Sequence, residues 1–541
     1  MIATVVGMVT AGRSAATRGV RPAIRALGVS AVAVLLTSCA PLLAANPQYA
    51  TDEGAGPQGA PEPTPTVSGP PAWEAPSADN DRALNWSDCT AQTFRDAAVA
   101  PVPGVTLECA TYDADLDPIK GANGTIPIGV VRARTSATPA DAGPLVFTTG
   151  SDLPSSTQLP VWLSRSGTDI LKTNPIVAVD RRGMGLSKAI DCRDLFDRQE
   201  MIDQTQFETG DDPVAKLGAI AQTATTTCTD TIAPGDSAYD NAHAAEDIER
   251  LRSTWDVPTI ALLGIGNGAQ VALAYAGSHP DKVSRLVLDS PLPLAIGAEA
   301  AAEQKVKGQQ AALDAFAAQC TAINCPLSPD PKGEVDALLK AAREGRGPNG
   351  ASEAAVADAI TTALAFPRGD RVAATNALGG AIAAARGGDT GAMTDLIAQA
   401  EDLRQTDGQF VNSCSDALNR PTPDRVRELV VAWNRTYPQF GTVGALRMVN
   451  CLSWPSGSAG EDPKDLKIPT LLLGVQNDPV IGNEGVAAVA ATIINAGSNS
   501  KRVIFQGIGH GASIYSPCAL PPVIGYLEKG TLPETDTFCP A

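Results

Sequence analysis

Short runs of apolar residues alternate with longer segments of helical periodicity from about residue 85 onward. The apolar runs predict strands at residues 126–134, 144–149, 175–180, 259–264, 285–290, 469–475 and 502–507. The later runs are continuous stretches of Val, Ile and Leu, which is typical of parallel strands covered on both faces. Helical stretches such as residues 242–255 fall between the runs. This order predicts an α/β fold with an open, mostly parallel central sheet.

The strand pattern stops between Ser290 and Pro469. The intervening residues form Ala-rich segments with helical spacing, separated by Gly and Pro clusters, for example residues 301–320, 331–342, 351–365 and 394–405. An insertion of this kind between two core strands predicts a helical cap over the carboxyl edge of the sheet. We therefore expect a core formed by residues 85–290 and 466–541, with a cap formed by residues 291–465.

The N-terminal residues have the pattern of an export signal. Four arginines precede an apolar stretch at residues 26–36, which is too short to span a membrane comfortably. The stretch ends at Leu36-Thr37-Ser38-Cys39, which resembles the bacterial lipobox, where the signal is cleaved before a cysteine that becomes lipidated. We predict a signal peptide over residues 1–39 and a lipid on Cys39 that anchors the exported protein to the outer face of the cytoplasmic membrane.

A Pro- and Gly-rich segment follows this cysteine at residues 40–84. Such a composition cannot bury a core. We expect this segment to be a disordered tether between the membrane and the folded part.

The cysteines fit the same compartment. There are eleven, and setting aside Cys39 leaves ten, an even number that indicates a disulfide framework in an exported chain. The simplest pairing joins neighbours in the sequence, although spacing alone does not fix connectivity: Cys89 with Cys109, Cys192 with Cys228, Cys320 with Cys325, Cys414 with Cys451, and Cys518 with Cys539. No Cys-x-x-Cys pair is present and the three histidines are scattered, so we expect no metal and no cofactor.

The net charge of −18 is spread along the 541 residues, and no Lys/Arg block follows the N-terminal region. This distribution argues against a nucleic-acid partner.

One strand-to-helix turn has the pattern of a catalytic elbow. The stretch TIALLGIGNGAQVALAYA, residues 259–276, runs from an apolar strand through glycines into a small-residue helix, as in the motif G-x-S-x-G. Gly266 stands where that motif has its nucleophilic serine. Glycine adopts the strained backbone of such a turn at little cost. The turn is therefore expected to persist without its attacking oxygen.

Two further residues stand where the partners of that serine belong. Asp478 follows a predicted strand directly, and His510 follows the next strand. The chain order of elbow, acid and histidine is that of α/β-hydrolases. In such a triad the acid orients the imidazole, which transfers the proton. The loop after the second predicted strand, together with the residue after the elbow, is the expected oxyanion region, and its candidate residues are Gly150, Ser151 and Asn267.

With these motifs, the chain resembles the secreted tripeptidyl-aminopeptidase-like family of actinobacterial α/β-hydrolases, which is related to proline iminopeptidases. The matching segments are residues 177–192, residues 264–290, NSCSDALN with the later CLSWP, and residues 468–539. The resemblance implies an α/β-hydrolase fold and serine peptidase machinery that includes Asp478 and His510. The chain departs from the family in three places. Position 266 is a glycine instead of the serine, the oxyanion loop keeps only Gly150 of the family's glycines, and the residues after Asp478 differ.

These departures leave three hypotheses. The first is a catalytically inactive protein that binds a peptide, a lipid or a cell-envelope partner in the cleft under the cap. The second is an active exported hydrolase or aminopeptidase that uses another nucleophile, such as Ser151 or a water activated by His510. The third is a dinucleotide-binding turn, since Gly264, Gly266 and Ala269 match G-x-G-x-x-G/A and Asp289 ends the following strand.

The remaining polar candidates have structural interpretations. His243 and His279 lie in polar helical contexts and are expected at the solvated surface. Asp180, Arg181 and Arg182 are expected to support the loop after their strand rather than to act on a substrate.

Overall fold

The structure is a computed structural model that describes residues 73–541 apart from 166, 206–209 and 456. The chain divides into two units, Met1–Thr66 and Val67–Ala541, and all the described residues belong to the second. The predicted signal peptide, the predicted lipidation site Cys39 and most of the predicted tether lie outside the described residues.

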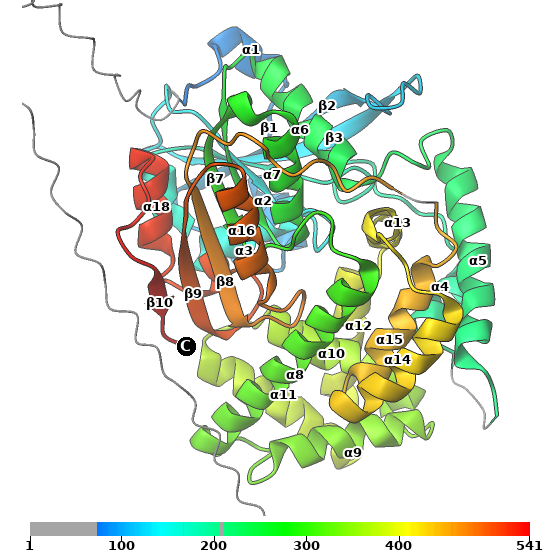
Figure 1. Cartoon of the computed structure of the whole chain (residues 1–541). Coiled ribbons are helices and arrows are strands. Elements are labelled where there is room, and N and C mark those ends of the chain that lie inside the picture. The colour runs from blue at the N-terminus through cyan, green and yellow to red at the C-terminus, as the bar shows by residue number, and fades with distance from the viewer. Residues whose placement is uncertain (1–72, 166, 206–209, 456) are drawn as a thin grey trace, which may run out of the picture. The chain divides into compact units, whose positions relative to one another are not determined.

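Ten strands form one sheet in the order β1-β2-β3-β5-β4-β6-β7-β8-β9-β10 (Figure 1). Their bounds are β1 Ser87–Asp88, β2 Val105–Asp115, β3 Thr125–Thr135, β4 Leu145–Thr148, β5 Ile176–Val179, β6 Ile260–Ile265, β7 Val283–Asp289, β8 Thr470–Asn477, β9 Ser500–Ile508 and β10 Thr537–Cys539. The pairs from β5 through β10 are parallel, and β1, β2 and β3 add antiparallel pairs at one edge. This is the α/β-hydrolase fold, so the predicted fold class is confirmed.

All seven predicted strands are present, and β1, β2 and β10 are strands that the apolar runs do not predict. Strand β2 alternates buried and exposed positions along much of its length, as expected for an antiparallel strand with one solvated face. A search for continuous apolar runs does not detect that period-two pattern.

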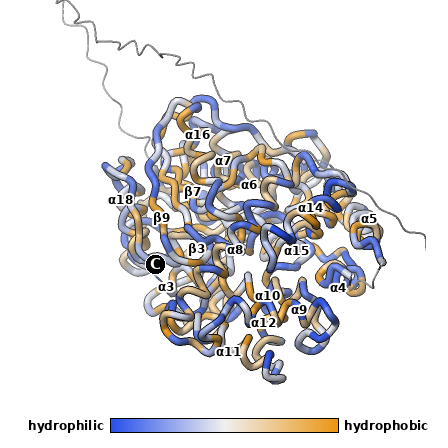
Figure 2. The backbone as a smooth tube through the Cα atoms, turned by 60° about the horizontal axis from the view of Figure 1, so that its bottom comes forward, coloured by the Kyte–Doolittle hydropathy of each residue, from blue (hydrophilic) through white to orange (hydrophobic). Residues whose placement is uncertain are grey.

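Helices cover both faces of the sheet. Leu286 and Leu288 of β7 pack in one core cluster, and Val287 between them packs in the other. This follows from the alternation of side chains along a strand. The first cluster includes residues of α6 (Asn241–Trp255), α7 (Asn267–Ser278) and α16 (Gly485–Asn495). The second includes residues of α2 (Thr90–Asp96), α3 (Ser155–Arg165) and α18 (Leu520–Lys529). Figure 2 shows hydrophobic stretches along the strands that these helices enclose.

The residues between β7 and β8 are helical and gather beyond one end of the strands (Figure 1). Their bounds are α8 Ala298–Ile323, α9 Pro331–Arg343, α10 Glu353–Ala365, α11 Arg371–Arg386, α12 Gly391–Arg404, α13 Asp407–Asp416, α14 Pro423–Thr436 and α15 Gly441–Arg447. Several begin at a side-chain cap, for example Ser352 before α10 and Thr422 before α14, which satisfies amide groups that the helix leaves free. These helices form the cap that the sequence predicts.

The predicted tether reaches too far along the chain. From Trp73 onward the residues pack on the core, and Ala78–Arg82 form helix α1. The indole of Trp73 donates to the carbonyl of Pro144, and Leu84 is buried. The prediction that residues up to 84 are disordered is therefore wrong for residues 73–84. The partner of Trp73 lies directly before β4, and the side chain of Asn80 donates to the carbonyl of Trp255 at the end of α6. The local composition does not indicate these contacts.

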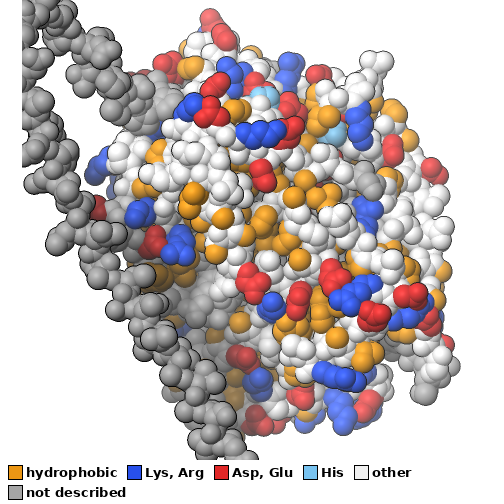
Figure 3. Space-filling model, in the orientation of Figure 1, with side chains coloured by type: hydrophobic (Ala, Val, Ile, Leu, Met, Phe, Trp, Pro, Cys, Tyr) orange, Lys and Arg blue, Asp and Glu red, His pale blue; other side chains and the backbone are white. Residues whose placement is uncertain are grey.

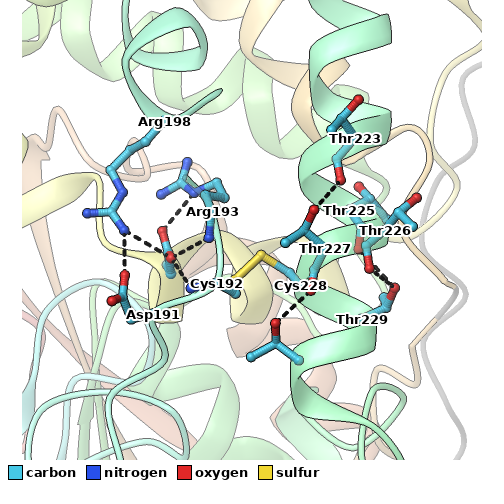
Figure 4. The surroundings of a disulfide bond; sticks show 12 residues. Asp191, Cys192, Arg193, Arg198, Thr223, Thr225, Thr226, Thr227, Cys228 and Thr229 are labelled. Atoms are coloured by element: carbon cyan, nitrogen blue, oxygen red, sulfur yellow. Dashed lines mark hydrogen bonds and ion pairs between the residues drawn. A yellow bond between two sulfur atoms is a disulfide. The ribbon is translucent and has the colours of Figure 1, made fainter. Parts of the chain in front are cut away.

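The structure contains all five disulfides proposed from neighbouring cysteines. The Cys192–Cys228 bond joins the loop after β5 to α5 (Pro213–Ile232), with Arg193 and Arg198 beside it (Figure 4). Asp407 at the start of α13 accepts from the backbone amides of Cys192 and Arg193 and pairs with the Arg193 guanidinium at 2.7 Å. This loop is thus fixed to the cap by both covalent and ionic contacts.

The described surface carries charges of both signs. On the face drawn in Figure 3, Lys and Arg side chains are interspersed with Asp and Glu. None of the helices that the structure describes is long and apolar enough to cross a membrane. Across the same residues there is no group of three or more His, Cys, Asp or Glu side chains arranged to hold a metal ion.

Candidate functional site

The glycine elbow has the backbone of a nucleophile turn. Gly266 lies between β6 and α7 with φ 58° and ψ −119°, a conformation that residues with side chains rarely adopt. A Cβ added there would lie 2.6 Å from Nε2 of His510 and would collide with Oδ2 of Asp152. A side chain at position 266 would therefore point at the histidine, into space that Asp152 already occupies.

Asp478 and His510 form the acid–imidazole pair that the sequence predicts. They follow β8 and β9, and Nδ1 of His510 lies 2.9 Å from Oδ2 of Asp478. Both residues are buried. The Asp478 carboxylate also accepts from the amide of Val480 at 2.9 Å. The loop after His510 is held by Asp289, whose carboxylate accepts from the amides of Ala512 and Ser513. Asp478 thus fixes the imidazole through Nδ1, as the acid of a triad does.

The other ring nitrogen of the imidazole lies next to a second carboxylate. Oδ2 of Asp152 lies 3.4 Å from Nε2 of His510 as an ion pair. The same oxygen accepts from the backbone amide of Asn267, the first residue of α7, at 2.6 Å. In a serine hydrolase this amide helps to bind the oxyanion of the substrate. The carboxylate of Asp152 therefore lies in the space that a substrate's oxyanion would occupy.

The two carboxylates determine the charge of His510. Burial alone would lower the pKa of this imidazole, but the charge of Asp478 and the neighbouring carboxylate of Asp152 raise the pKa to about 10. Conversely, the pairing with His510 holds the pKa of Asp152 below its usual value despite burial. At pH 7 a group with that pKa is neutral in about one molecule in a thousand. A protonated imidazole cannot accept a proton from a nucleophile.

The three candidate oxyanion residues do lie together, and their amides are already engaged. The amide of Gly150 donates to Oγ1 of Thr148 at 3.2 Å, and that of Ser151 donates to Oδ1 of Asn267 at 2.8 Å. The amide of Asn267 donates to Asp152, as described above. The protein's own side chains therefore fill the donor positions that would stabilise developing negative charge.

Ser151, one of the two alternatives that the second hypothesis leaves open, is buried in the wall of a cavity beneath the cap. The two ring nitrogens of His510 face Asp478 and Asp152 instead. Within the described residues, no imidazole is thus aligned to activate the Ser151 hydroxyl.

A buried network joins the elbow to the cap. Arg181, in the loop after β5, donates to Oδ1 of Asn267 and pairs with Asp416 of α13 at 2.7 Å. The side-chain amide of Asn267, through Nδ2, also donates to Asp416 at 3.1 Å. On the cap side, Gln409 of α13 donates to the backbone carbonyl of Asp152 at 2.7 Å. Asp152 is therefore positioned from the sheet and from the cap.

Asp180 and Arg182 are placed in the same loop. Asp180 accepts from the amides of Ser156 and Leu186 at 2.8 and 2.7 Å, and Arg182 pairs with Asp247 of α6 at 2.7 Å. Both groups bind the backbone or the core of the protein rather than a cavity.

The surface prediction for His243 is wrong. His243 is 1% exposed and lies between Asp240, 2.6 Å from Nδ1, and Asp117, 3.1 Å from Nε2. The loop between β2 and β3 covers this end of α6, a contact that the helical sequence does not indicate. His279 is partly exposed and pairs with Glu246 at 2.8 Å.

The structure argues against the hypothesis of a dinucleotide-binding turn, because Asp289 cannot bind a ribose. Asp289 is fully buried and both of its carboxylate oxygens are bonded to the loop after His510, so it is not available to a ribose. The start of α7, where a pyrophosphate would lie, instead holds the carboxylate of Asp152. This negative charge would repel a phosphate.

Comparison with known sequences finds a family model that matches the last part of this site. Residues 437–539 match the family described as TAP-like protein. The match covers this C-terminal module of the chain. The module contains β8 and β9, the Asp478–His510 pair and the Cys518–Cys539 disulfide.

The chain is also similar to serine protease Hip1 of Mycobacterium tuberculosis H37Rv and of Mycobacterium bovis. Identity is 23% over 407 residues in each case, which covers 67% of this chain and 74% of the relative. Among solved structures, an esterase from Rhodococcus sp. ECU1013 covers 77% of this chain and 97% of its own, at 16% identity and a TM-score of 0.35. We assign the fold from the strand order, since a superposition at this level does not establish one.

Asp152 is absent from the site residues predicted from the sequence, although it stands in the loop predicted as the oxyanion region. The signal was a carboxylate in a segment where the resembling family has glycines. Also absent are Lys305 of α8 and Arg404 of α12, which line cavities beside Asp152. Both appear in the sequence as ordinary charged positions of Ala-rich helices.

Proposed function

We propose that this protein is an exported ligand-binding protein built on a hydrolase scaffold, which does not perform acyl transfer at the elbow. The observation that supports this most directly is the carboxylate of Asp152, which pairs with His510 and bonds to the amide of Asn267. A ligand-binding role needs the cleft under the cap but does not need a nucleophile.

Acyl transfer by a serine triad needs three working parts: an attacking oxygen, an imidazole that can accept its proton, and free amides for the oxyanion. Position 266 has no side chain, the pairing of His510 favours its protonated form, and the candidate amides are bonded within the protein. Loss of the serine alone costs about a million-fold in turnover. The other two changes remove most of what would remain.

The ligand classes that fit this role are a peptide, a lipid or a cell-envelope partner. Two cavities adjoin Asp152 between the sheet and the cap, with volumes of about 270 and 220 Å³. Concave, largely apolar sites with a few polar groups are where proteins bind small ligands. We place the ligand in these cavities.

Five disulfides are typical of proteins that fold outside the cytoplasm. Together with the signal and lipobox pattern of the sequence, they support an envelope location. We further propose that a lipid on Cys39 holds the protein at the outer face of the cytoplasmic membrane.

A carboxylate nucleophile is the second candidate function. Asp152 lies against His510 and the amide of Asn267, so its free oxygen could attack the acyl carbon of an ester, form an acyl–Asp152 anhydride and expel the alcohol, which takes its proton from solvent water. Water that gives up a proton to neutral His510 would then hydrolyse this anhydride, which releases the carboxylic acid and returns the carboxylate of Asp152. The high pKa of His510 opposes this function at neutral pH, because little of the imidazole is available as a base.

One experiment separates the two candidates. Purified protein is assayed with aminoacyl and alkyl esters from pH 6 to 10, while the same protein is screened for ligand-dependent shifts in melting temperature. The binding function predicts no turnover above that of an Asp152→Asn variant at any pH. Turnover that rises toward pH 10 and disappears in Asp152→Asn would establish the nucleophile instead.

A further inference from the structure

The two cavities beside Asp152 differ in character. The first is walled largely by apolar residues from the strand ends and the cap, among them Leu292, Val306, Phe440, Val443 and Ile481. The second shares part of that wall but includes a larger share of polar and charged groups, among them Lys305, Asp358, Arg404 and Arg447. Together they form an apolar chamber with a charged end.

Most charged groups at that end already have partners. Arg447 binds both carboxylate oxygens of Asp358 at 2.8 Å, and Arg193 pairs with Asp407 at 2.7 Å. Asp152 pairs with His510. These ion pairs leave little net attraction for a charged ligand.

Lys305 and Arg404 are different. Neither makes a hydrogen bond or an ion pair with any residue in the described part of the chain, although both are half-buried. The guanidinium of Arg404 lies over the ring of Phe366, 5.6 Å from its centre. Burial together with the charges of Arg404 and Arg447 lowers the pKa of Lys305 to about 7. Two cations that face a cavity without a counter-ion are unfavourable unless a ligand supplies one.

The charged residues around this end limit the charge of the anion that can bind there. The positive groups are Lys305, Arg404, Arg447 and His510, and the negative groups are Asp152, Asp358 and Asp478. When all are charged, four positive and three negative groups leave one excess positive charge. A singly charged head balances this excess, whereas a dianion would exceed it.

We propose that the two cavities bind a single-chain amphiphile whose carboxylate lies on Lys305 and Arg404 and whose alkyl chain fills the apolar chamber. The inference rests on the proposed binding function, of which it names the ligand class. A peptide fits this chamber less well, because its backbone amides would face an apolar wall without hydrogen-bond partners.

The test measures binding of octanoate, decanoate and dodecanoate to the full-length protein by calorimetry, with decanol and decylamine as matched ligands without the negative charge. Each added methylene that enters the chamber should strengthen binding about fourfold until the chamber is full. Decanol and decylamine should bind at least about tenfold more weakly than decanoate, since a charge-assisted contact is lost.

Variants locate the two ends of the ligand. Lys305→Gln and Arg404→Gln should each weaken decanoate binding about tenfold or more and leave decanol binding unchanged. Lys307→Gln is the matched control, because Lys307 is a partly exposed residue of the same helix and pairs with Glu484 outside both cavities. Ala302→Phe should block the longer chains, whereas Ala300→Phe, at an exposed position of α8, should not.

Three outcomes decide the matter. Equal affinity for decanol and decanoate, or unchanged decanoate binding in both Lys305→Gln and Arg404→Gln, would overturn the proposed ligand. A melting shift with peptides but none with alkyl carboxylates would overturn this inference and leave the binding function standing. Hydrolysis of p-nitrophenyl decanoate that requires His510 would refute the binding function. It would not contradict the proposed contact of the ligand's carboxylate with Lys305 and Arg404.

Discussion

Asp152, in the loop after β4, and His510, in the loop after β9, form an ion pair of 3.4 Å in the space where a serine at position 266 would project. The pair explains why the elbow, the acid and the imidazole coexist with a missing nucleophile. The carboxylate balances the imidazolium and satisfies the amide of Asn267. The backbone amide at the start of α7 therefore has a partner within the protein, whereas Nε2 of His510 has the ion pair but no hydrogen bond among the described residues.

Restoring the serine alone is expected to fail. Gly266→Ser would drive its Cβ into the carboxylate of Asp152, so the single variant should show no esterase activity and reduced stability. The double variant Gly266→Ser with Asp152→Gly removes the collision and frees the amide of Asn267. It should hydrolyse p-nitrophenyl acetate at least about a hundredfold faster than Asp152→Gly alone. Equal activity of the single and double serine variants would show that Asp152 does not block the site.

The ion pair should make stability depend on pH in the alkaline range. Because the pKa of His510 is raised from 6.5 to about 10 in the folded state, its contribution is complete below pH 6.5 and is lost as the pH rises through 10. The difference in unfolding free energy between the wild type and His510→Gln should therefore shrink between pH 6.5 and 10. Urea unfolding at several pH values measures this difference. A constant difference across that range would exclude a charged imidazole.

Acid should weaken the contact between the Cys192 loop and the cap. Arg193 and the two backbone amides keep the pKa of Asp407 below its ordinary value although burial would raise it. Its contribution to stability is present above that ordinary value and is lost as the pH falls through the lowered one. Asp407→Asn leaves Arg193 buried without its partner and should cost about 3 to 5 kcal/mol at pH 7.

Asp191 offers the control for that variant. It pairs with Arg198 at 3.0 Å but its side chain is 90% exposed, so Asp191→Asn should change the unfolding free energy little. Similar losses in both variants would show that burial of the Asp407 pair is not what stabilises the loop.

The disulfides should differ in their contribution according to the length of chain that they close. Cys192–Cys228 spans 36 residues and Cys320–Cys325 spans 5. Loop entropy predicts losses of about 4 and about 2 kcal/mol when each pair is replaced by serines. Denaturant unfolding of the two double variants measures the ratio. A larger loss for the short loop would point to native contacts rather than chain entropy.

Membrane attachment depends on a single residue in our proposal. Cys39→Ser should release the protein from the membrane fraction and abolish metabolic labelling with a radioactive fatty acid, since one side chain carries the lipid. Cell fractionation and labelling check both effects. A Cys109→Ser variant controls for general loss of a cysteine, and retention of Cys39→Ser in the membrane would contradict the anchor.

The sequence by itself determined the architecture and the absence of a nucleophilic side chain at position 266. Continuous apolar runs such as β6 and β7 predict buried parallel strands, because the period of hydrophobic residues is a local property of the chain. The glycines around position 266 predict the turn and show directly that no side-chain oxygen is present there. The even set of cysteines indicates an oxidising compartment for a similar reason, since composition alone carries that information.

Only the tertiary structure decided what replaced the serine. Asp152, His510 and Asn267 come from loops far apart in the chain, and their pairing depends on strand order, which brings the carboxyl ends of β4, β6 and β9 to one edge. The same holds for His243, which sequence context places at the surface and the β2–β3 loop covers, and for Lys305 and Arg404, whose lack of partners depends on how the cap helices pack. Charge pairing and burial are set by neighbours in space, and those neighbours exist only once the sheet and the cap have formed.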